Sequence, residues 1–204
     1  MNEAQSIYGG NLPAMDWVLN RVLSDIEVIR NDLTLQFGND PVEHIRTRIK
    51  SDESMHDKCR RRGLDETVDS ALSVIRDAIG VRVVCQFLND VFAIADFFSS
   101  RPGIEVVECK DYIRRAKPNG YRSYHMILRV RYEGGAPSDY DSYFVEVQLR
   151  TISQDTWASL EHTLKYKKDI ADAELICAEL KRCADELEST DISMQTLRDL
   201  IISL

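Results

Sequence analysis

Several features that would place a protein in a membrane, outside the cell or around a zinc ion are missing from this sequence. No apolar run approaches the roughly 20 residues that a transmembrane helix needs. Residues 1–15 lack the basic stretch followed by an apolar stretch that marks an export signal. The five cysteines are odd in number and form no C-x-x-C pair, so we expect free thiols. These absences predict a cytoplasmic protein with no membrane partner.

Linkers and repeats are also lacking, and only 5 prolines and 9 glycines occur in 204 residues. With 44% hydrophobic and 29% charged residues, the chain is long enough to bury a core and short enough to form one domain. We therefore expect a single domain with terminal extensions.

Positive charge is scarce overall, yet it is concentrated in two segments. The net charge is -8, but residues 44–62 hold seven basic residues against three acidic ones, and residues 110–131 hold seven against one. A polyphosphate is neutralised by positioned cations rather than by net charge, so this pattern favours a local anion site. Two solvated basic faces are the other interpretation. Nucleic acid is a weaker expectation, because backbone binding usually uses a broadly basic surface.

The apolar spacing predicts helices followed by strands. Helical spacing over 15–35 ends near Gly38, and Ser51 and Gly63 bracket a second helix with N-cap and C-cap residues. A third helically spaced segment runs over 68–79, and another helix is expected over 90–100. Strands are predicted over 81–87, 104–109, 123–131 and 143–150, the last two as a hairpin, and helices over 156–168, 171–188 and 194–204.

The two hairpin strands are expected to be amphipathic. Tyr124, Met126, Leu128 and Val130 alternate with polar residues, as do Tyr143, Val145, Val147 and Leu149. Because side chains alternate between the faces of a strand, one face packs on helices and the other presents His, Arg, Glu and Gln. That second face is a candidate reaction surface.

Four constellations combine residues that could bind and transform a nucleotide. Lys50 precedes a helix N-terminus, and Ser54, Lys58 and Arg61 share one stripe of that helix, where a triphosphate could be held. Asp77 and Arg82 flank a glycine at an expected helix-to-strand junction, which suits a magnesium carboxylate and a cation. The others are Lys110-Asp111-Tyr112 with Lys117-Pro118-Asn119-Gly120-Tyr121-Arg122-Ser123-x-His125, and Glu146-Val147-Gln148-Leu149-Arg150-Thr151 with Asp155. Each alone is also compatible with an ordinary capped helix, turn or charged surface.

In this order, the four segments closely resemble the synthetase domain of the RelA/SpoT family, and the short chain is similar to its small alarmone synthetase branch. The resemblance covers about residues 41–168. It implies a nucleotidyltransferase-like α+β fold, a mixed β-sheet flanked by α-helices, with a helical N-terminal extension (1–40), a catalytic core (41–168) and C-terminal helices (169–204). It also implies that ATP and GDP or GTP are the substrates, that GTP pyrophosphokinase is the activity, and that Mg²⁺ is the cofactor.

The resemblance assigns roles to matching positions. It implies an ATP site at Arg48, Lys50, Ser54, Lys58, Arg61 and Arg82, with Arg48 and Arg82 flanking adenine. Asp77 and Glu146 are the implied catalytic and metal-binding residues, and Glu146 engages the acceptor's 3′-hydroxyl. The implied acceptor site is Lys110, Lys117, Tyr121, His125, Gln148 and Asp155, with Tyr121 stacking on guanine.

Several alternatives stay open at this point. The acceptor could be an adenine nucleotide or tRNA, although the acidic remainder of the chain argues against tRNA, so no obligate nucleic-acid partner is expected. A catalytically silent module that binds guanine nucleotides or RNA is a second alternative, against which the presence of Asp77 and Glu146 argues. Relatives form homotetramers through terminal helices, so a homotetramer is expected. Family members usually have Asp-[Ile/Leu]-Ala-Gly where this chain has Asp77-Ala78-Ile79-Gly80, and we expect packing to absorb the exchange.

Overall fold

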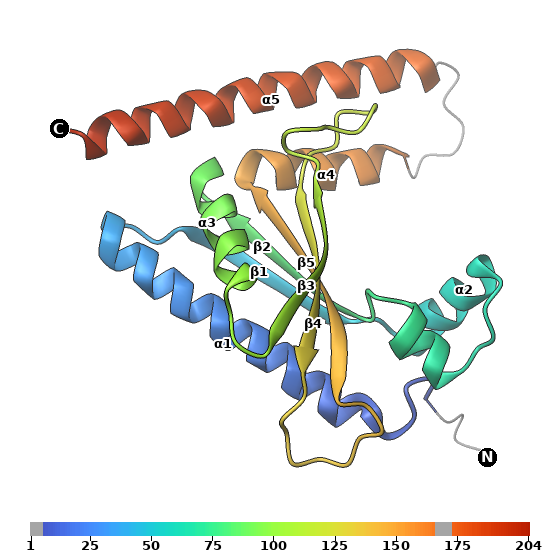
Figure 1. Cartoon of the computed structure of the whole chain (residues 1–204). Helices are drawn as coiled ribbons and strands as arrows, with labels where there is room; N and C mark the ends of the chain where they lie inside the picture. Colours follow the sequence, from blue (N-terminus) through green and yellow to red (C-terminus); the bar gives the residue numbers. More distant parts are fainter. Residues whose placement is uncertain (1–5, 166–172) are drawn as a thin grey trace.

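The protein is built on a five-stranded mixed sheet with strand order β1-β2-β5-β4-β3 (Figure 1). The computed structural model describes residues 6–165 and 173–204. The strands are β1 (Val42–Ile49), β2 (Ile79–Cys85), β3 (Ile104–Asp111), β4 (Tyr124–Arg131) and β5 (Ser142–Thr151). Strands β2 and β5 are parallel, and every other neighbouring pair is antiparallel. The predicted α+β class and the β4–β5 hairpin are confirmed.

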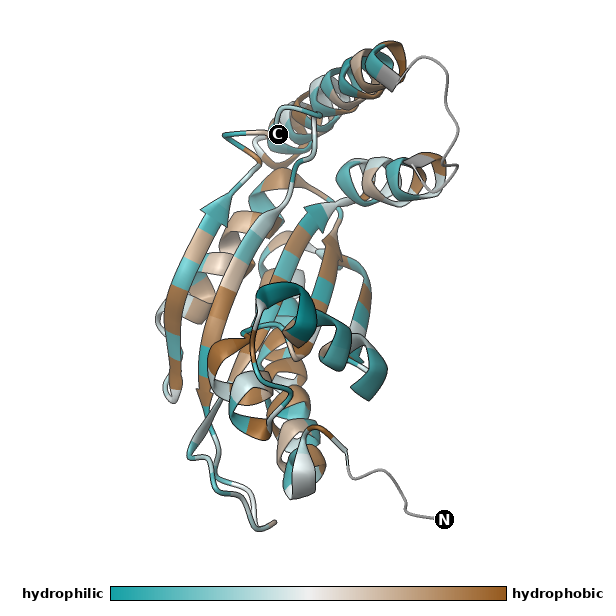
Figure 2. Cartoon of the chain, turned by 90° about the vertical axis from the view of Figure 1, so that its right-hand side faces the viewer, coloured by the Kyte–Doolittle hydropathy of each residue, from teal (hydrophilic) through white to brown (hydrophobic). Residues whose placement is uncertain are grey.

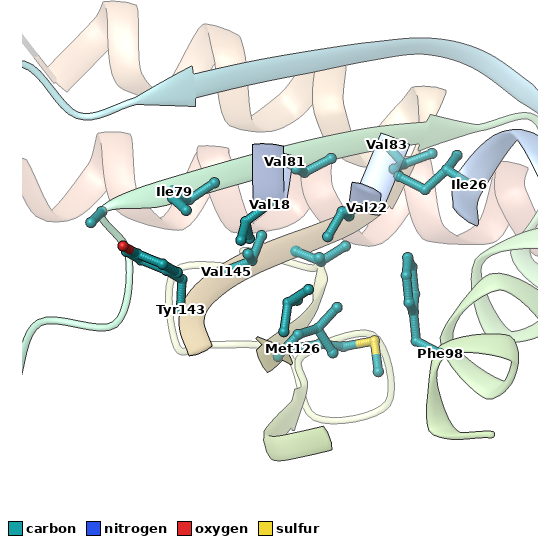
Figure 3. Close-up of a cluster of buried hydrophobic side chains, with 14 of the residues drawn as sticks. Val18, Val22, Ile26, Ile79, Val81, Val83, Phe98, Met126, Tyr143 and Val145 are labelled. Carbon is teal, nitrogen blue, oxygen red and sulfur yellow. The ribbon is translucent and has the colours of Figure 1, made fainter. Parts of the chain in front are cut away.

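Helices α1 (Leu12–Phe37) and α3 (Leu88–Ser99) supply the side chains that cover one face of the sheet. Helix α1 ends where Gly38 adopts a left-handed conformation, with φ 79°. Figure 3 shows part of the resulting core, between α1, α3 and the strands. The labelled members of this buried cluster are Val18, Val22, Ile26, Ile79, Val81, Val83, Phe98, Met126, Tyr143 and Val145. Each fully buried aliphatic side chain contributes about 1.5–3 kcal/mol, so this face stabilises the fold.

Helix α2 (Asp52–Arg62) lies toward the other face of the sheet. The Ser51 hydroxyl accepts a hydrogen bond from the Ser54 backbone N–H, and Gly63 closes the helix at φ 65°, as predicted. Figure 2 shows this hydrophilic helix in front of the sheet. Only Met55 and Cys59 of α2 are buried, so most of its cations remain accessible.

The C-terminal region differs from the prediction. Helix α4 (Ile152–Lys165) starts directly after β5, and α5 (Ala173–Ile202) is one continuous helix where two were expected. The polar residues Ser189 and Thr190 interrupt the apolar spacing, but the helix continues through them. Just beyond them, Asp191 accepts a hydrogen bond from the Thr151 hydroxyl, and Gln195 accepts one from the Asn89 backbone N–H. The predicted end of one helix at residue 168 and the predicted start of the next at residue 171 lie outside the described residues.

Two further predictions were wrong at the start of the sheet. Strand β1 was missed, because five of its eight residues are charged or polar side chains on an edge strand. The helix expected over 68–79 is a short turn of π-helix (η2, Ser70–Val74), and β2 already starts at Ile79. Asp77 therefore lies in the connection before β2, and Arg82 lies in the middle of that strand. Ala78 and Ile79, the two exchanged residues, are both buried.

No helix in residues 6–165 or 173–204 is long and apolar enough to cross a membrane.

Candidate active site

The strand register places most of the candidate residues in two rows across one face of the sheet. Directly paired residues of neighbouring strands point to the same face. One row, followed from β1 to β3, consists of Arg46, Arg82, Gln148, His125 and Lys110. The adjacent row consists of Arg48, Gly80, Glu146, Ile127 and Glu108. Because the opposite face is apolar and buried, this is the polar face that the alternation predicted, and it stays the candidate reaction surface.

A first pocket of about 240 Å³ opens over β1, β2 and β5. Gly80 lies in the lining of this pocket beside Arg48, where a Cβ would be in ordinary van der Waals contact with the Arg48 side chain at 3.5 Å. The pocket is lined by Arg46, Thr47, Arg48, Gly80, Val81, Arg82, Glu146 and Gln148. Three guanidinium groups around a concave surface can stack on a purine and neutralise an anion.

A second pocket of about 340 Å³ lies between α2 and the sheet. Its lining brings four cations together with three carboxylates: Lys58, Arg62, Arg76, Lys110, Asp77, Glu108 and Glu146, beside Val74 and Ile127. Glu146 lines both pockets. The cationic helix and the polar sheet face thus meet across a shared space, with this carboxylate at the boundary.

Asp77 is held by two lysines. The Lys58 ammonium hydrogen-bonds Asp77 Oδ2, and the Lys50 Nζ lies 3.6 Å from the same oxygen. Burial works to raise the pKa of Asp77, but Lys58, Lys50 and Arg48 together lower it below its usual range. Burial also lowers the pKa of Lys50, against the attraction of Asp77. The other oxygen, Oδ1, is buried and has no hydrogen-bond partner among the described residues.

Glu146 is held by neighbours on its own sheet. Gln148 Nε2 donates to Glu146 Oε2 at 3.0 Å, and His125 Nδ1 lies 3.6 Å from Oε1. Burial works to raise the pKa of Glu146, whereas His125, and to a smaller extent Gln148, lower it; Asp77 opposes them through its negative charge. The net pKa is lowered, so Glu146 is an ionised acceptor at neutral pH.

The turn before β4 places Tyr121 next to His125. Gly120 adopts φ 91° and packs so closely on α5 that a Cβ would come within 2.6 Å of Ala184, which only glycine permits. The Tyr121 hydroxyl lies 2.8 Å from His125 Nε2. The exposed Lys117 ammonium lies over the rings of Tyr112 and Tyr121, 4.6 and 4.8 Å from their centroids.

Asp155 is buried between two arginines. Its Oδ1 accepts from Arg82 Nη1 at 3.3 Å and from Arg150 Nη1 at 3.0 Å, while His44 Nε2 lies 3.8 Å from Oδ2. Only 6% of Asp155 is exposed, so in this state it orients arginines rather than facing open space. Burial, followed by the nearby Arg150 charge, lowers the pKa of Arg82.

Seven of the predicted site residues line neither pocket: Lys50, Ser54, Arg61, Lys117, Tyr121, His125 and Asp155. Ser54 and Arg61 are exposed on α2, where Ser54 accepts from the Ser51 hydroxyl at 2.9 Å and Arg61 donates to the Asp57 carbonyl. Sequence reasoning did not assign several residues that line the pockets or support them: Arg46, Arg62, Arg76, Glu108 and Arg150. The alternation of Arg46 with Arg48 would have revealed the first of these, had β1 been recognised.

The two carboxylates suit a magnesium ion that arrives with a nucleotide. No group of three or more His, Cys, Asp or Glu side chains able to hold a metal occurs in the part of the chain that the structure describes. Mg²⁺ is usually bound by one or two carboxylates, substrate phosphates and water, rather than by a cage of protein ligands. The unpartnered Asp77 Oδ1 and the nearby Glu146 fit that donor set.

Fold and site together fit one class of protein: a transferase with two polar, cation-lined pockets that share one carboxylate. Comparison with known proteins gives the family. Residues 47–171 match the model of the "Region found in RelA / SpoT proteins", which is more than half of the chain. The chain belongs to the RelA/SpoT family.

Relatives in sequence and in structure agree with this assignment. The chain is 33% identical to the GTP pyrophosphokinase YwaC of Bacillus subtilis over 87% of this chain and 84% of the relative. It is 31% identical to YjbM, another GTP pyrophosphokinase of that organism, over 83% and 78%. The crystal structure of small alarmone synthetase 2 from B. subtilis superposes with a TM-score of 0.78 at 30% identity, covering 92% of this chain and 97% of that one. Small alarmone synthetase 1, solved with its product pppGpp, gives 0.78 at 25% identity, over 95% and 96%.

Proposed function

We propose that this chain is a GTP pyrophosphokinase that transfers the β,γ-pyrophosphate of ATP to the 3′-hydroxyl of GDP or GTP. The products are ppGpp or pppGpp and AMP. Family membership and two relatives named for this activity support the proposal. The observation that carries it is the position of Glu146, which lines both pockets and so can face a nucleophile beside a polyphosphate.

The first pocket is proposed to bind the adenosine of ATP and the second its phosphates. Arg48 and Arg82 border the first pocket, where their planar guanidinium groups can flank the adenine ring. Lys58 and three further cations line the second pocket, which suits a chain of phosphates. Lys50 and Ser54 are proposed to bind ATP phosphates at the N-terminus of α2, because free N–H groups at a helix N-terminus attract phosphate. Arg61, in the last turn of α2, is proposed to bind ATP through its positive charge.

The acceptor is proposed to lie along β4 and β5. Tyr121 offers a ring for guanine once Lys117 moves from it toward a phosphate, which the exposure of Lys117 allows. His125 and Gln148 lie beside Glu146, where they would position the ribose. Lys110, Lys117 and Asp155 complete the proposed acceptor site. Asp155 would act indirectly, because its carboxylate orients Arg82 and Arg150.

The chemistry is an in-line displacement. The acceptor's 3′-oxygen forms a bond to the β-phosphorus of ATP, the bond from that phosphorus to the α,β-bridging oxygen breaks, and AMP leaves. Glu146 is a much weaker base than an alkoxide, so it orients the hydroxyl and accepts its proton late in the reaction. The surrounding lysines and arginines stabilise the charge on the transferred group.

Mg²⁺ is the proposed cofactor, held by Asp77 and Glu146 together with the phosphates of ATP. When bound, it would neutralise charge on the transferred pyrophosphate. Lys58 and Lys50, whose ammonium groups lie on the same Asp77 oxygen, would bind the phosphates beside it.

We also propose that the enzyme is a cytoplasmic homo-oligomer, with a tetramer as the expected form. Large apolar side chains are exposed along α4 and α5: Ile152, Leu160, Leu164, Leu175, Ile192, Met194, Leu197, Leu200, Ile201 and Ile202. We propose that part of this apolar surface packs against another copy of the chain. Light scattering coupled to gel filtration would give the mass, and a monomer of 23.4 kDa would contradict this proposal.

The activity is tested by chromatography of nucleotides after incubation with ATP and Mg²⁺. Separate reactions contain GDP, GTP, GMP, ADP or tRNA as the acceptor, each with wild type and with Glu146→Gln. We expect AMP and a 3′-pyrophosphorylated guanine nucleotide in equal amounts with wild type only. AMP formed without a guanine acceptor, or a labelled adenine nucleotide or tRNA product, would overturn the proposal. Nucleotide binding without AMP formation would indicate the silent binding module.

A further inference from the structure

Arg150 is the most deeply buried arginine beside the candidate active site. It lies on β5, four residues after Glu146, and only 4% of it is exposed. Its guanidinium group uses all three nitrogens: Nε donates to Ser123 Oγ at 3.3 Å and Nη1 to Asp155 at 3.0 Å. Nη2 donates to the Tyr121 hydroxyl at 2.6 Å and to Gln148 Oε1 at 3.3 Å. Because arginine can only donate hydrogen bonds, each of these neighbours must accept the bond that Arg150 makes to it.

The first chain runs through Tyr121 and His125. Because an arginine can only donate, the Tyr121 oxygen accepts the bond from Arg150, and the tyrosine proton is free to donate to His125 Nε2 at 2.8 Å. A neutral imidazole that accepts at Nε2 carries its proton on Nδ1. That Nδ1 faces Glu146 Oε1 at 3.6 Å.

The second chain runs through Gln148. Arg150 donates to Oε1 of this amide, so its NH₂ group must point the other way. Nε2 indeed donates to Glu146 Oε2 at 3.0 Å. The two chains therefore direct one N–H toward each oxygen of the same carboxylate, at 3.0 Å from Gln148 and 3.6 Å from His125, and both start at Nη2 of Arg150.

We propose that Arg150 is a positioning residue for pyrophosphate transfer: it fixes the His125 tautomer and the Gln148 amide orientation, so that both present N–H groups to Glu146. This keeps Glu146 a hydrogen-bond acceptor aimed at the acceptor hydroxyl. Arg150 itself does not line either pocket, so it acts through its neighbours rather than on substrate. The mechanistic consequence rests on the proposed function, whereas the hydrogen-bond polarity does not.

Other charged groups also surround Glu146 and set the background for any pH effect. Across both pockets these groups are Arg46, Arg48, Lys58, Arg62, Arg76, Asp77, Arg82, Glu108 and Lys110, with His125 on the neighbouring strand. They remain in place when Arg150 is replaced. A change in the pH dependence of Glu146 after that replacement therefore reports on the two chains.

The first test needs no nucleotide. Imidazole ¹⁵N spectra of wild type resolve the four histidines, with His125 assigned by its absence in His125→Gln. At the high end of the pH range, where imidazoles are neutral, we expect the Nδ1–H tautomer for His125. Arg150→Met and Tyr121→Phe should each shift it toward the Nε2–H tautomer that free imidazole side chains favour. An Nε2–H tautomer in wild type, or no change in the variants, would overturn the proposal.

The second test follows kcat against pH at saturating ATP and GDP. Arg150→Met should lower kcat by about ten- to hundredfold, the effect of misplacing a reacting group, and should move the acid limb to higher pH. Tyr121→Phe keeps the buried charge and breaks only one chain, so it covers the case in which Arg150→Met does not fold. An unmoved acid limb in both variants would contradict a positioning role.

Arg198→Met is the matched control. Arg198 is a buried arginine on α5 that donates to Asp90 Oδ1 at 2.6 Å, away from both pockets. Its replacement should lower the melting temperature and leave both the His125 tautomer and the acid limb unchanged. If wild type shows the expected tautomer but forms no alarmone, the proposed function fails and the polarity inference stands. If wild type forms the alarmone but shows the Nε2–H tautomer, the polarity inference fails and the proposed function stands.

Discussion

Asp77 and Glu146 are two largely buried carboxylates with lowered pKa values at one pocket, but they are held in different ways. Asp77 contacts the ammonium groups of Lys58 and Lys50, at the ends of flexible side chains on or beside α2. Glu146 contacts His125 and Gln148, which project from the sheet itself. The partners of Asp77 are therefore charged groups on flexible side chains. The partners of Glu146 are an imidazole and an amide held on the sheet.

This difference suits two different tasks. Lysine side chains are flexible, so we expect the Asp77 region to rearrange when substrate binds. Fixed donors keep one geometry, which is what preorganisation for a transition state requires. Variants that affect one region and spare the other can test this division.

The largest effect is expected for Glu146→Gln. The amide has the same shape but cannot accept the hydroxyl proton, so kcat should fall by about 10²- to 10⁴-fold. Assays of AMP formation at saturating nucleotides measure this. The melting temperature should change little, which shows that the fold is intact. Retention of more than a tenth of the activity would assign the role of base to another group.

Asp77→Asn should mainly raise the Mg²⁺ requirement. Loss of one carboxylate from a site shared with substrate phosphates is expected to increase the Mg²⁺ concentration for half-maximal rate by about ten- to hundredfold. Titration of Mg²⁺ at fixed ATP measures it. Glu108→Gln is the control, because Glu108 lines the same pocket but pairs with Lys110 and is more exposed. Equal shifts in both variants would remove the special role of Asp77.

A smaller effect on pH dependence is expected for His125→Gln. Burial raises the pKa of Glu146 and the His125 contact lowers it, so loss of the imidazole should raise that pKa. Activity requires ionised Glu146, and the acid limb of kcat should therefore move to higher pH. A limb that stays in place, or moves to lower pH, would show that His125 does not govern Glu146.

The smallest effect is expected on stability, in Lys58→Met. Burial raises the pKa of Asp77, while Lys58 is the largest of the contacts that lower it. A carboxylate with a depressed folded-state pKa stabilises the fold above its unfolded pKa of about 4, and that contribution is lost as the pH falls through the folded value. The variant should thus melt at a lower temperature than wild type at pH 7, and the difference should shrink on acidification. A difference that grows in acid would contradict this account.

Much of the fold was predictable where the sequence carries a strong period. The alternation in β4 and β5 gave both the hairpin and the polar face bearing Glu146, and Ser51 and Gly63 bracketed α2. Strand β1 was not recognisable, because an edge strand that presents Arg46 and Arg48 has little apolar alternation. Local propensity also could not show that η2 ends early and leaves Asp77 in a connection.

The candidate site was predictable only in part, for reasons of burial and register. Residue types and the family resemblance pointed to Asp77, Glu146 and most of their neighbours, but the alignment of Arg46, Arg82 and Gln148 in one row depends on pairing between strands far apart in sequence. The burial of Arg150 depends on the Tyr121 turn and α4 closing over one end of β5. No local pattern reports such tertiary contacts.

The most direct test of the two-pocket arrangement is a crystal structure of Glu146→Gln with ATP, Mg²⁺ and GDP bound together. The account predicts the phosphates of ATP among Lys58, Arg62 and Asp77, and the acceptor's 3′-oxygen within hydrogen-bonding distance of residue 146. It also predicts an in-line path from that oxygen to the β-phosphorus. ATP outside the two pockets, an acceptor that lies away from β4 and β5, or a 3′-oxygen turned away from residue 146 would contradict the account.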